Sequence, residues 1–120
     1  NNHELGEMFG VTLTTDEEII TYAKKLQKLG ARNVLISMAK DGAILITEQE
    51  DVKRIGVPKG TVKNSVGAGD SMVAGFVASY SQDHDYQKAL VYGTATGSAT
   101  AFSEGLATKD VVDELLKQLV

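Results

Sequence analysis

Two glycines and an aspartate stand directly before a helical pattern, in the run Gly67-Ala68-Gly69-Asp70. Glycines let the backbone bend and approach a ligand without a Cβ in the way, and the first N–H groups of a helix lack intrahelical acceptors. The helix dipole favours a phosphate or a developing negative charge at that end. An aspartate there could accept a proton from a hydroxyl group that attacks a bound phosphoryl group. The run therefore predicts an anion pocket beside a general base.

Two common phosphate motifs do not fit this run. The Gly-Lys-Ser/Thr ending of a Walker loop is missing, and Met72 occupies the third glycine position of the dinucleotide fingerprint. Glycine-rich turns before helices are common, and Asp70 could simply cap the helix. Taken in isolation, these four residues favour the cap over the catalyst.

The pattern of apolar residues predicts the elements that must position this turn. Helices are predicted over 4–10, from Thr15 to Gly30, after the glycines, from Asp85 to near Gly105, and over 108–119. Thr15 and Glu18 form a capping-box pattern. Short apolar runs predict strands at 34–38, 43–47 and 52–57, followed by a loop at 59–66. This order predicts one α/β layered domain.

Two of these predicted helices differ in the size of the side chains on the face that is expected to pack. The helix after the glycines has an apolar stripe that is expected to face the core and consists of Met72, Val73, Phe76, Val77 and Tyr80. The next helix is rich in small residues between Ala89 and Ala101, which would permit close approach of a neighbour.

Composition excludes several classes of function. A net charge of −4 argues against a nucleic-acid partner, whose phosphates are normally met by clustered Lys and Arg. No apolar run approaches the roughly 20 residues of a membrane-spanning helix, so no membrane role is expected. The absence of cysteine is compatible with the cytoplasm. His3 and His84 have no partner at metal-ligand spacing, so neither is assigned a metal.

The longer run from Asn64 to Phe76 resembles the C-terminal signature of the PfkB, or ribokinase-like, carbohydrate kinases, and the resemblance covers nearly the whole chain. It implies that Asp70 is the base for the sugar hydroxyl, and that Gly67, Ala68 and Gly69 supply the N–H groups of the anion hole. Asn1 and Glu4 resemble the family's Asn-x-x-Glu motif, which places Mg²⁺ and phosphate through water. Glu4 could equally be an ordinary carboxylate at a helix start.

The resemblance also implies an ATP site. The segment from Ser37 to Gly42 resembles the strand and turn beside the ATP phosphates and ribose, and the segment from Gly97 to Gly105 resembles the helix and loop near the adenine. The implied nucleotide-binding set is Ser37, Lys40, Asp41, Gly42, Asn64, Ser65, Gly67, Gly69, Thr100 and Ser103. Many members have Asp in place of Asn64, where it helps a potassium site, and Asn in place of Thr100.

Within the family, Asn64-Ser65 and the segment 98–105 are similar to 1-phosphofructokinases and, next, to tagatose-6-phosphate kinases. The resemblance implies ATP- and Mg²⁺-dependent phosphorylation of a phosphosugar, most simply fructose 1-phosphate to fructose 1,6-bisphosphate. The implied fold is the C-terminal portion of a three-layer α/β/α sandwich, with residues 1–120 as one ATP- or phosphate-binding fragment. The sugar-binding part and the lid are expected to lie upstream.

Two alternatives remain open at this point. The chain as given could bind nucleotide or phosphate without catalysis, or it could be a purely structural domain. A cut through a sheet should also expose an edge and an apolar face, which favours a homo-oligomer.

Overall fold

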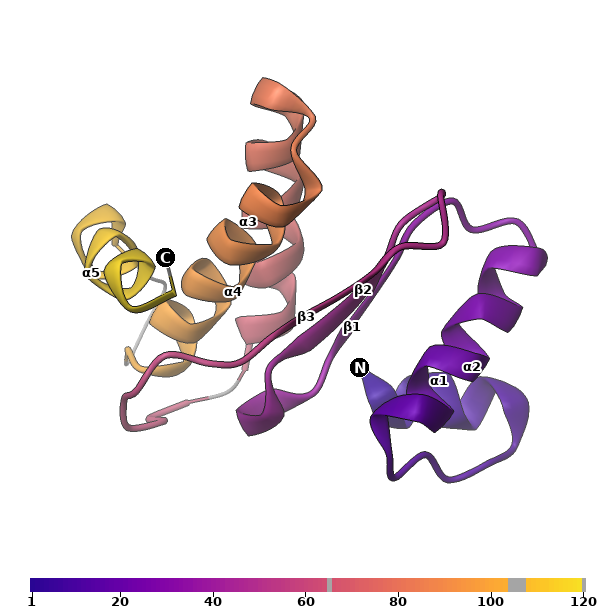
Figure 1. Ribbon diagram of the computed structural model, residues 1–120. Coiled ribbons are helices and arrows are strands. Elements are labelled where there is room, and N and C mark those ends of the chain that lie inside the picture. Colours follow the sequence, from indigo (N-terminus) through magenta and orange to yellow (C-terminus); the bar gives the residue numbers. More distant parts are fainter. Residues whose placement is uncertain (65, 104–107, 120) are drawn as a thin grey trace. The chain divides into compact units, whose positions relative to one another are not determined.

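The computed structural model describes residues 1–64, 66–103 and 108–119 of the chain. Its backbone forms two compact units, residues 1–54 and 55–120. Figure 1 shows the elements of both units along the chain. None of the helices in the described ranges is long and apolar enough to cross a membrane.

The first unit contains helices α1 (Asn2–Phe9) and α2 (Asp16–Lys28) and most of a three-stranded sheet. The sheet has the order β1-β2-β3, with β1 at Val34–Ser37, β2 at Ala43–Ile46 and β3 at Val52–Ile55. Strands β1 and β2 are antiparallel, and Val34 pairs with Ile46 while Ser37 pairs with Ala43. The short 3-10 helix η1 (Ala39–Asp41) joins them. The three predicted strands are confirmed, with ends one or two residues shorter.

One apolar cluster holds α1, α2 and the first two strands together. Every residue of β2 is buried, as expected of a strand with a continuous apolar run. The rings of Phe9 and Tyr22 join α1 to α2, with their centroids 5.2 Å apart. The buried members of the cluster are Leu5, Leu13, Ile19, Ala23, Val34, Ile36, Met38, Ile44 and Ile46.

The predicted capping box of α2 is confirmed. The Thr15 hydroxyl accepts a hydrogen bond from the Glu18 N–H at 3.2 Å, and the Glu18 carboxylate accepts one from the Thr15 N–H at 3.2 Å. The hydroxyls of Thr14 and Thr15 also donate to Glu18 Oε1. These hydrogen bonds favour the ionised carboxylate and lower the pKa of Glu18, with the Thr14 hydroxyl as the largest cause.

The described part of the second unit is built on helices α3 (Ala68–Asp83), α4 (Tyr86–Ala101) and α5 (Lys109–Leu119). Helices α3 and α4 lie side by side (Figure 1). Their contact is close because it is made by small residues: a Cβ added at Gly93 would lie 2.8 Å from the Met72 carbonyl oxygen, and one at Gly75 would lie 2.7 Å from Thr96 Oγ1. The expected close approach at this helix is confirmed. On another face of α4, Ala95 and Ala99 pack against Val112 and Leu115 of α5.

The predicted core-facing stripe of α3 is partly wrong. Val73 and Val77 are each 55% exposed, whereas the buried residues of this helix are Gly75 and Ser79. Helical spacing identifies the stripe of large apolar side chains, but two helices approach most closely where the side chains are small. The contact with α4 therefore lies on the small-residue face of α3.

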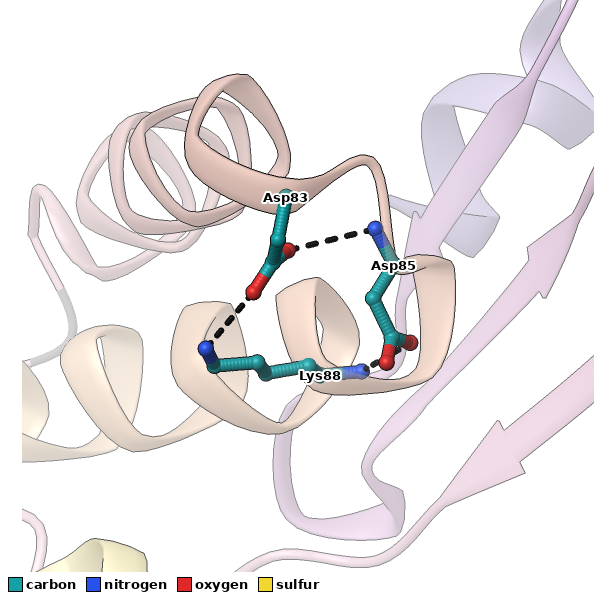
Figure 2. A network of polar contacts seen from close by, with 3 residues as sticks. All are labelled: Asp83, Asp85 and Lys88. Atoms are coloured by element: carbon teal, nitrogen blue, oxygen red, sulfur yellow. Dashed lines mark hydrogen bonds and ion pairs between the residues drawn. The ribbon is translucent and has the colours of Figure 1, made fainter.

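A charged network closes the connection between α3 and α4 (Figure 2). Asp85 caps α4, since its carboxylate accepts from the Lys88 N–H at 3.0 Å. The Asp83 carboxylate accepts from the Asp85 N–H at 3.2 Å and from Lys88 Nζ at 2.6 Å. The hydrogen bond from Lys88 is the largest cause that lowers the pKa of Asp83, and the same bond raises the pKa of Lys88. His84 makes the bend between the helices with a left-handed backbone, φ 58°.

Candidate active site

The glycine turn has an unusual geometry for a helix start. Gly67 is the N-cap residue of α3 with φ 83° and ψ −5°, in the left-handed region, and α3 begins at Ala68. No side chain among the described residues caps this end, whereas Asn1, Thr15 and Asp85 each accept a hydrogen bond from the first turn of their own helix. Within this part of the chain the first N–H groups of α3 have no side-chain acceptor, so they are available to an acceptor from outside. Because the helix dipole is positive at this end, that acceptor is favoured to be an anion.

Asp70 lies in the first turn of α3, three residues after the cap position. Since Gly67 holds the cap position, the interpretation of Asp70 as the N-cap is wrong. Its side chain is exposed, and the carboxylate has no hydrogen-bond or ion-pair partner within the described ranges. A carboxylate that is free of protein donors can accept a proton from a ligand hydroxyl beside the open N–H groups.

The end of α4 adjoins both flanks of the glycine turn. Upstream, the Ala101 carbonyl accepts hydrogen bonds from the N–H groups of Lys63 and Asn64, at 2.8 and 3.1 Å. Downstream, Thr100 Oγ1 donates to Ser71 Oγ at 2.8 Å. Ser71 was not among the predicted site residues, although it follows Asp70 directly in the signature.

Two other residues of the predicted nucleotide set have local partners here. The Asn64 side-chain oxygen accepts from the Val66 N–H at 3.0 Å, which is an Asx-type turn. The Ser103 hydroxyl donates to the Ala99 carbonyl at 2.7 Å, in the last turn of α4. Ser65 lies outside the described residues, as do Gly105 and the rest of the segment 104–107. The structure therefore brings Asn64, the glycine turn, Thr100 and Ser103 together within the second unit.

In the first unit, Asn1 and Glu4 form a reciprocal pair at the start of α1. Asn1 Oδ1 accepts from the Glu4 N–H at 2.8 Å, and Asn1 Nδ2 donates to Glu4 Oε1 at 2.6 Å. Their side chains are 45% and 72% exposed. The pair thus caps the helix and also presents a carboxylate to solvent.

The described residues contain no group of three or more His, Cys, Asp or Glu that could cage a metal ion. Mg²⁺ usually keeps several waters and takes only one or two carboxylates together with substrate phosphates. The exposed carboxylate of Glu4 fits that mode of binding, in which water stands between protein and ion.

The remaining predicted nucleotide contacts lie at the β1–β2 connection of the first unit. Ser37 ends β1, and Lys40 and Asp41 are exposed on η1. Gly42 is buried and has φ 93° and ψ −135°, and its carbonyl accepts from the Met38 N–H at 2.8 Å. A backbone with this positive φ favours glycine, so the position fixes the shape of the turn that carries Lys40 and Asp41.

Comparison with known proteins gives the class of protein to which the chain belongs. The chain belongs to the pfkB family of carbohydrate kinases, whose family model matches residues 1–112. Its fold is part of the ribokinase-like α/β fold, as the sequence resemblance implied. A solved structure of Arabidopsis thaliana ribokinase, complexed with ribose and ATP, superposes with a TM-score of 0.87 at 26% identity, covering 98% of this chain and 39% of that one.

Two curated relatives within this family are similar to the chain over nearly its whole length. The chain is 52% identical over 119 residues to the 1-phosphofructokinase of Bacillus subtilis (strain 168), covering 99% of this chain and 39% of the relative. It is 38% identical over 120 residues to the D-tagatose-1-phosphate kinase of Bacillus licheniformis, with the same coverage of 99% and 39%. The chain thus spans 39% of the length of each relative. The tagatose enzyme is named for the 1-phosphate, whereas the sequence resemblance pointed to tagatose-6-phosphate kinases.

Proposed function

We propose that the protein to which this chain belongs transfers the γ-phosphoryl group of ATP to a hydroxyl group of a phosphosugar. The preferred reaction is the conversion of fructose 1-phosphate to fructose 1,6-bisphosphate. The observation that carries the proposal is the glycine-bent start of α3 with the exposed Asp70 in its first turn. In the described part of the chain this helix start has no side-chain cap and Asp70 has no partner. The 52% identity to a 1-phosphofructokinase supports the choice of substrate.

In this proposal the glycine turn and Asp70 divide the chemistry. Asp70 accepts the proton of the attacking sugar hydroxyl, and the N–H groups of the turn from Gly67 to Gly69 stabilise the negative charge that develops on the transferred phosphoryl group. A transfer of this kind depends mainly on positioning and electrostatic stabilisation. Bound Mg²⁺ supplies neutralisation of the phosphate charge, and Asn1 and Glu4 are the residues that would hold it through water.

The residues proposed to contact the nucleotide are taken from the set that the family resemblance implies. Ser37, Lys40, Asp41 and Gly42 would lie along its phosphates and ribose. The other contacts would come from Asn64, Ser65, Gly67, Gly69 and Ser103. The support for ATP is the family membership and the relative that is described as an ATP complex.

The choice of sugar substrate rests on the names of the relatives. The two curated relatives are named for ketose 1-phosphates, fructose 1-phosphate and D-tagatose 1-phosphate. Tagatose 6-phosphate and the substrates of other pfkB sugar kinases are the alternatives. A panel of these sugars assayed with the full-length enzyme separates them by kcat/KM. We also propose a cytoplasmic location, since the relatives are named as kinases of sugar phosphates.

The test of the base is Asp70→Asn in the full-length kinase. The carboxamide keeps the size of the side chain but cannot take the proton, so kcat should fall by about 10²-fold or more. Asp110→Asn is the matched control, since Asp110 is an exposed acidic residue in the first turn of α5. Its kcat should stay within about twofold of wild type. If Asp70→Asn keeps more than about a tenth of the wild-type kcat, Asp70 is not the base.

A second proposal concerns the 120-residue chain by itself, because it spans 39% of its relatives' length. We infer that residues 1–120 act as a single C-terminal nucleotide- or phosphate-binding fragment that does not turn over, and that it self-associates through surface that is exposed without the rest of the protein. Calorimetry with Mg-ATP should detect binding, which a purely structural domain would not show. Phosphosugar-dependent ADP release from the fragment, or a clean monomer by sedimentation at high concentration, would contradict this inference.

A further inference from the structure

We propose that Thr100 is a positioning residue of the phosphoryl-transfer site: its buried hydroxyl fixes the first turn of α3 through Ser71 and so sets the position of Asp70. The proposal rests on the proposed function above. It also differs from the adenine-side role that the family resemblance implies for Thr100. The two roles predict different kinetics.

The hydrogen bond that carries the proposal joins residues 29 positions apart in the chain. Thr100 is 3% exposed, and its Oγ1 donates to Ser71 Oγ at 2.8 Å. A threonine in a helix commonly donates to a carbonyl of its own helix, as Thr96 does to the Tyr92 carbonyl at 2.9 Å. Thr100 uses its hydroxyl between helices instead. Because the hydroxyl is buried and its proton is donated to Ser71, it has no donor left for a nucleotide.

The turn that Thr100 reaches has few restraints of its own. Gly67 supplies a left-handed backbone, and none of the described side chains caps α3. Glycine has more conformational freedom to lose than any other residue, so a turn built on it is ordered only by its surroundings. The last turn of α4 supplies that order on both flanks, by the Ala101 carbonyl upstream and by Thr100 downstream.

Close backbone packing makes the link between the two helices stiff. A Cβ added at Gly97 would lie 2.9 Å from the Ala68 carbonyl oxygen, so the end of α4 lies directly against the start of α3. The Ser71 N–H also donates to the Gly67 carbonyl at 2.9 Å, which ties Ser71 back to the glycine turn. Asp70 lies between these two tied residues. Loss of the Thr100 hydroxyl would remove the side-chain hydrogen bond that fixes this first turn, while the backbone contact at Gly97 would remain.

The test is Thr100→Val in the full-length kinase, with Thr100→Ser as the conservative variant. A misplacement of about 1 Å can cost about 10²-fold in rate, so we expect kcat to fall roughly 10- to 100-fold in Thr100→Val. The KM for ATP should change less than about twofold, since binding contacts are retained. Thr100→Ser keeps the donor and should restore kcat to within about threefold of wild type. Thr96→Val, the same substitution one turn earlier on α4, should leave kcat within about twofold.

Hydrogen exchange of the full-length protein gives a readout that needs no turnover. The Ser71 N–H, which donates to the Gly67 carbonyl, should exchange about 10-fold faster in Thr100→Val than in wild type, Thr100→Ser or Thr96→Val. Unchanged exchange there, or a raised KM for ATP with an unchanged kcat, would overturn the positioning role. If the wild-type enzyme phosphorylates no phosphosugar, the proposed function fails, and the exchange result still decides whether Thr100 orders the turn.

Discussion

The contact between α3 and α4 can be tested by adding a single methyl group, in Gly93→Ala. A Cβ at this position would lie 2.8 Å from the Met72 carbonyl oxygen and 3.2 Å from both the backbone nitrogen and the Cβ of Phe76. Ordinary contacts of a Cβ lie at 3.4–4 Å. Two of the three atoms are backbone, so no side-chain rotation can relieve the overlap and the helices must separate.

The expected magnitude combines two opposing effects. Overpacking of a well-packed interface costs about 1–3 kcal/mol. Replacement of glycine by alanine within a helix returns about 1 kcal/mol through helix propensity. Because the clash is with backbone, we expect a cost of about 2–3 kcal/mol, in the upper part of that range, so the free energy of unfolding should fall by about 1–2 kcal/mol. For a unit of this size that corresponds to a decrease in Tm of roughly 5–15 °C.

The assay is thermal and urea unfolding followed by circular dichroism at 222 nm, since α3, α4 and α5 contribute much of the helical signal. Gly69→Ala is the matched control, because a Cβ at Gly69 on α3 would meet no atom within 4 Å. It should be neutral or stabilising by up to about 1 kcal/mol, from helix propensity alone. If Gly93→Ala is as stable as Gly69→Ala, the two helices do not approach as closely as the structure has them, and the small-residue explanation of the contact fails.

Two further predictions concern exposed carboxylates at helix ends. Thr15→Ala should lower the stability of the first unit by about 0.5–2 kcal/mol in urea unfolding at pH 7, through loss of the N-cap. The folded-state pKa of Glu18 is lowered, so its contribution to folding stability is present above its unfolded pKa of about 4.5 and is lost as the pH falls through the folded value. Glu18→Gln should therefore flatten the dependence of stability on acid pH. An unchanged pH profile would argue against the capping box. In Lys88→Met the pKa of Asp83 should rise toward its usual value of 3.8 but stay below it, because the Asp85 N–H still donates to the Asp83 carboxylate. An NMR titration of Asp83 measures this pKa, and Lys109→Met is the control.

Local signals in the sequence were sufficient for much of the fold. The capping box at Thr15 defines the start of α2 because both of its hydrogen bonds lie within four residues. The hairpin from Val34 to Ile46 follows from two apolar runs that are separated by a turn with a glycine. In both cases the interacting groups are near neighbours in the chain, so the spacing contains the needed information.

The packing of α3 depended on information that spacing lacks. Val73 and Val77 have the period of a buried stripe but are exposed, whereas Gly75 and Ser79 are buried. Which face of α3 is covered depends on α4, which packs against it. Because α4 presents the small residues Gly93 and Gly97, the closest contact is made with the face of α3 that has the smallest side chains. The same limit applies to the site. The Thr100–Ser71 hydrogen bond joins two helices. The sequence around Thr100 does not indicate which residue of another helix its hydroxyl will bind.

The backbone at Gly67 explains why the cap interpretation of the glycine turn is wrong. A side-chain cap normally requires an extended backbone, as at Thr15 with φ −115° and at Asp85 with φ −96°. Gly67 has φ 83°, a conformation that Ser, Thr or Asp adopts only with strain. The left-handed backbone at Gly67 therefore disfavours a capping side chain, which would have accepted hydrogen bonds from the first N–H groups of α3. Asp70 lies inside the helix, and its carboxylate has no partner among the described residues. The donors and the carboxylate therefore lie at the same solvent-exposed helix start, which is the arrangement that the proposed phosphoryl transfer would use.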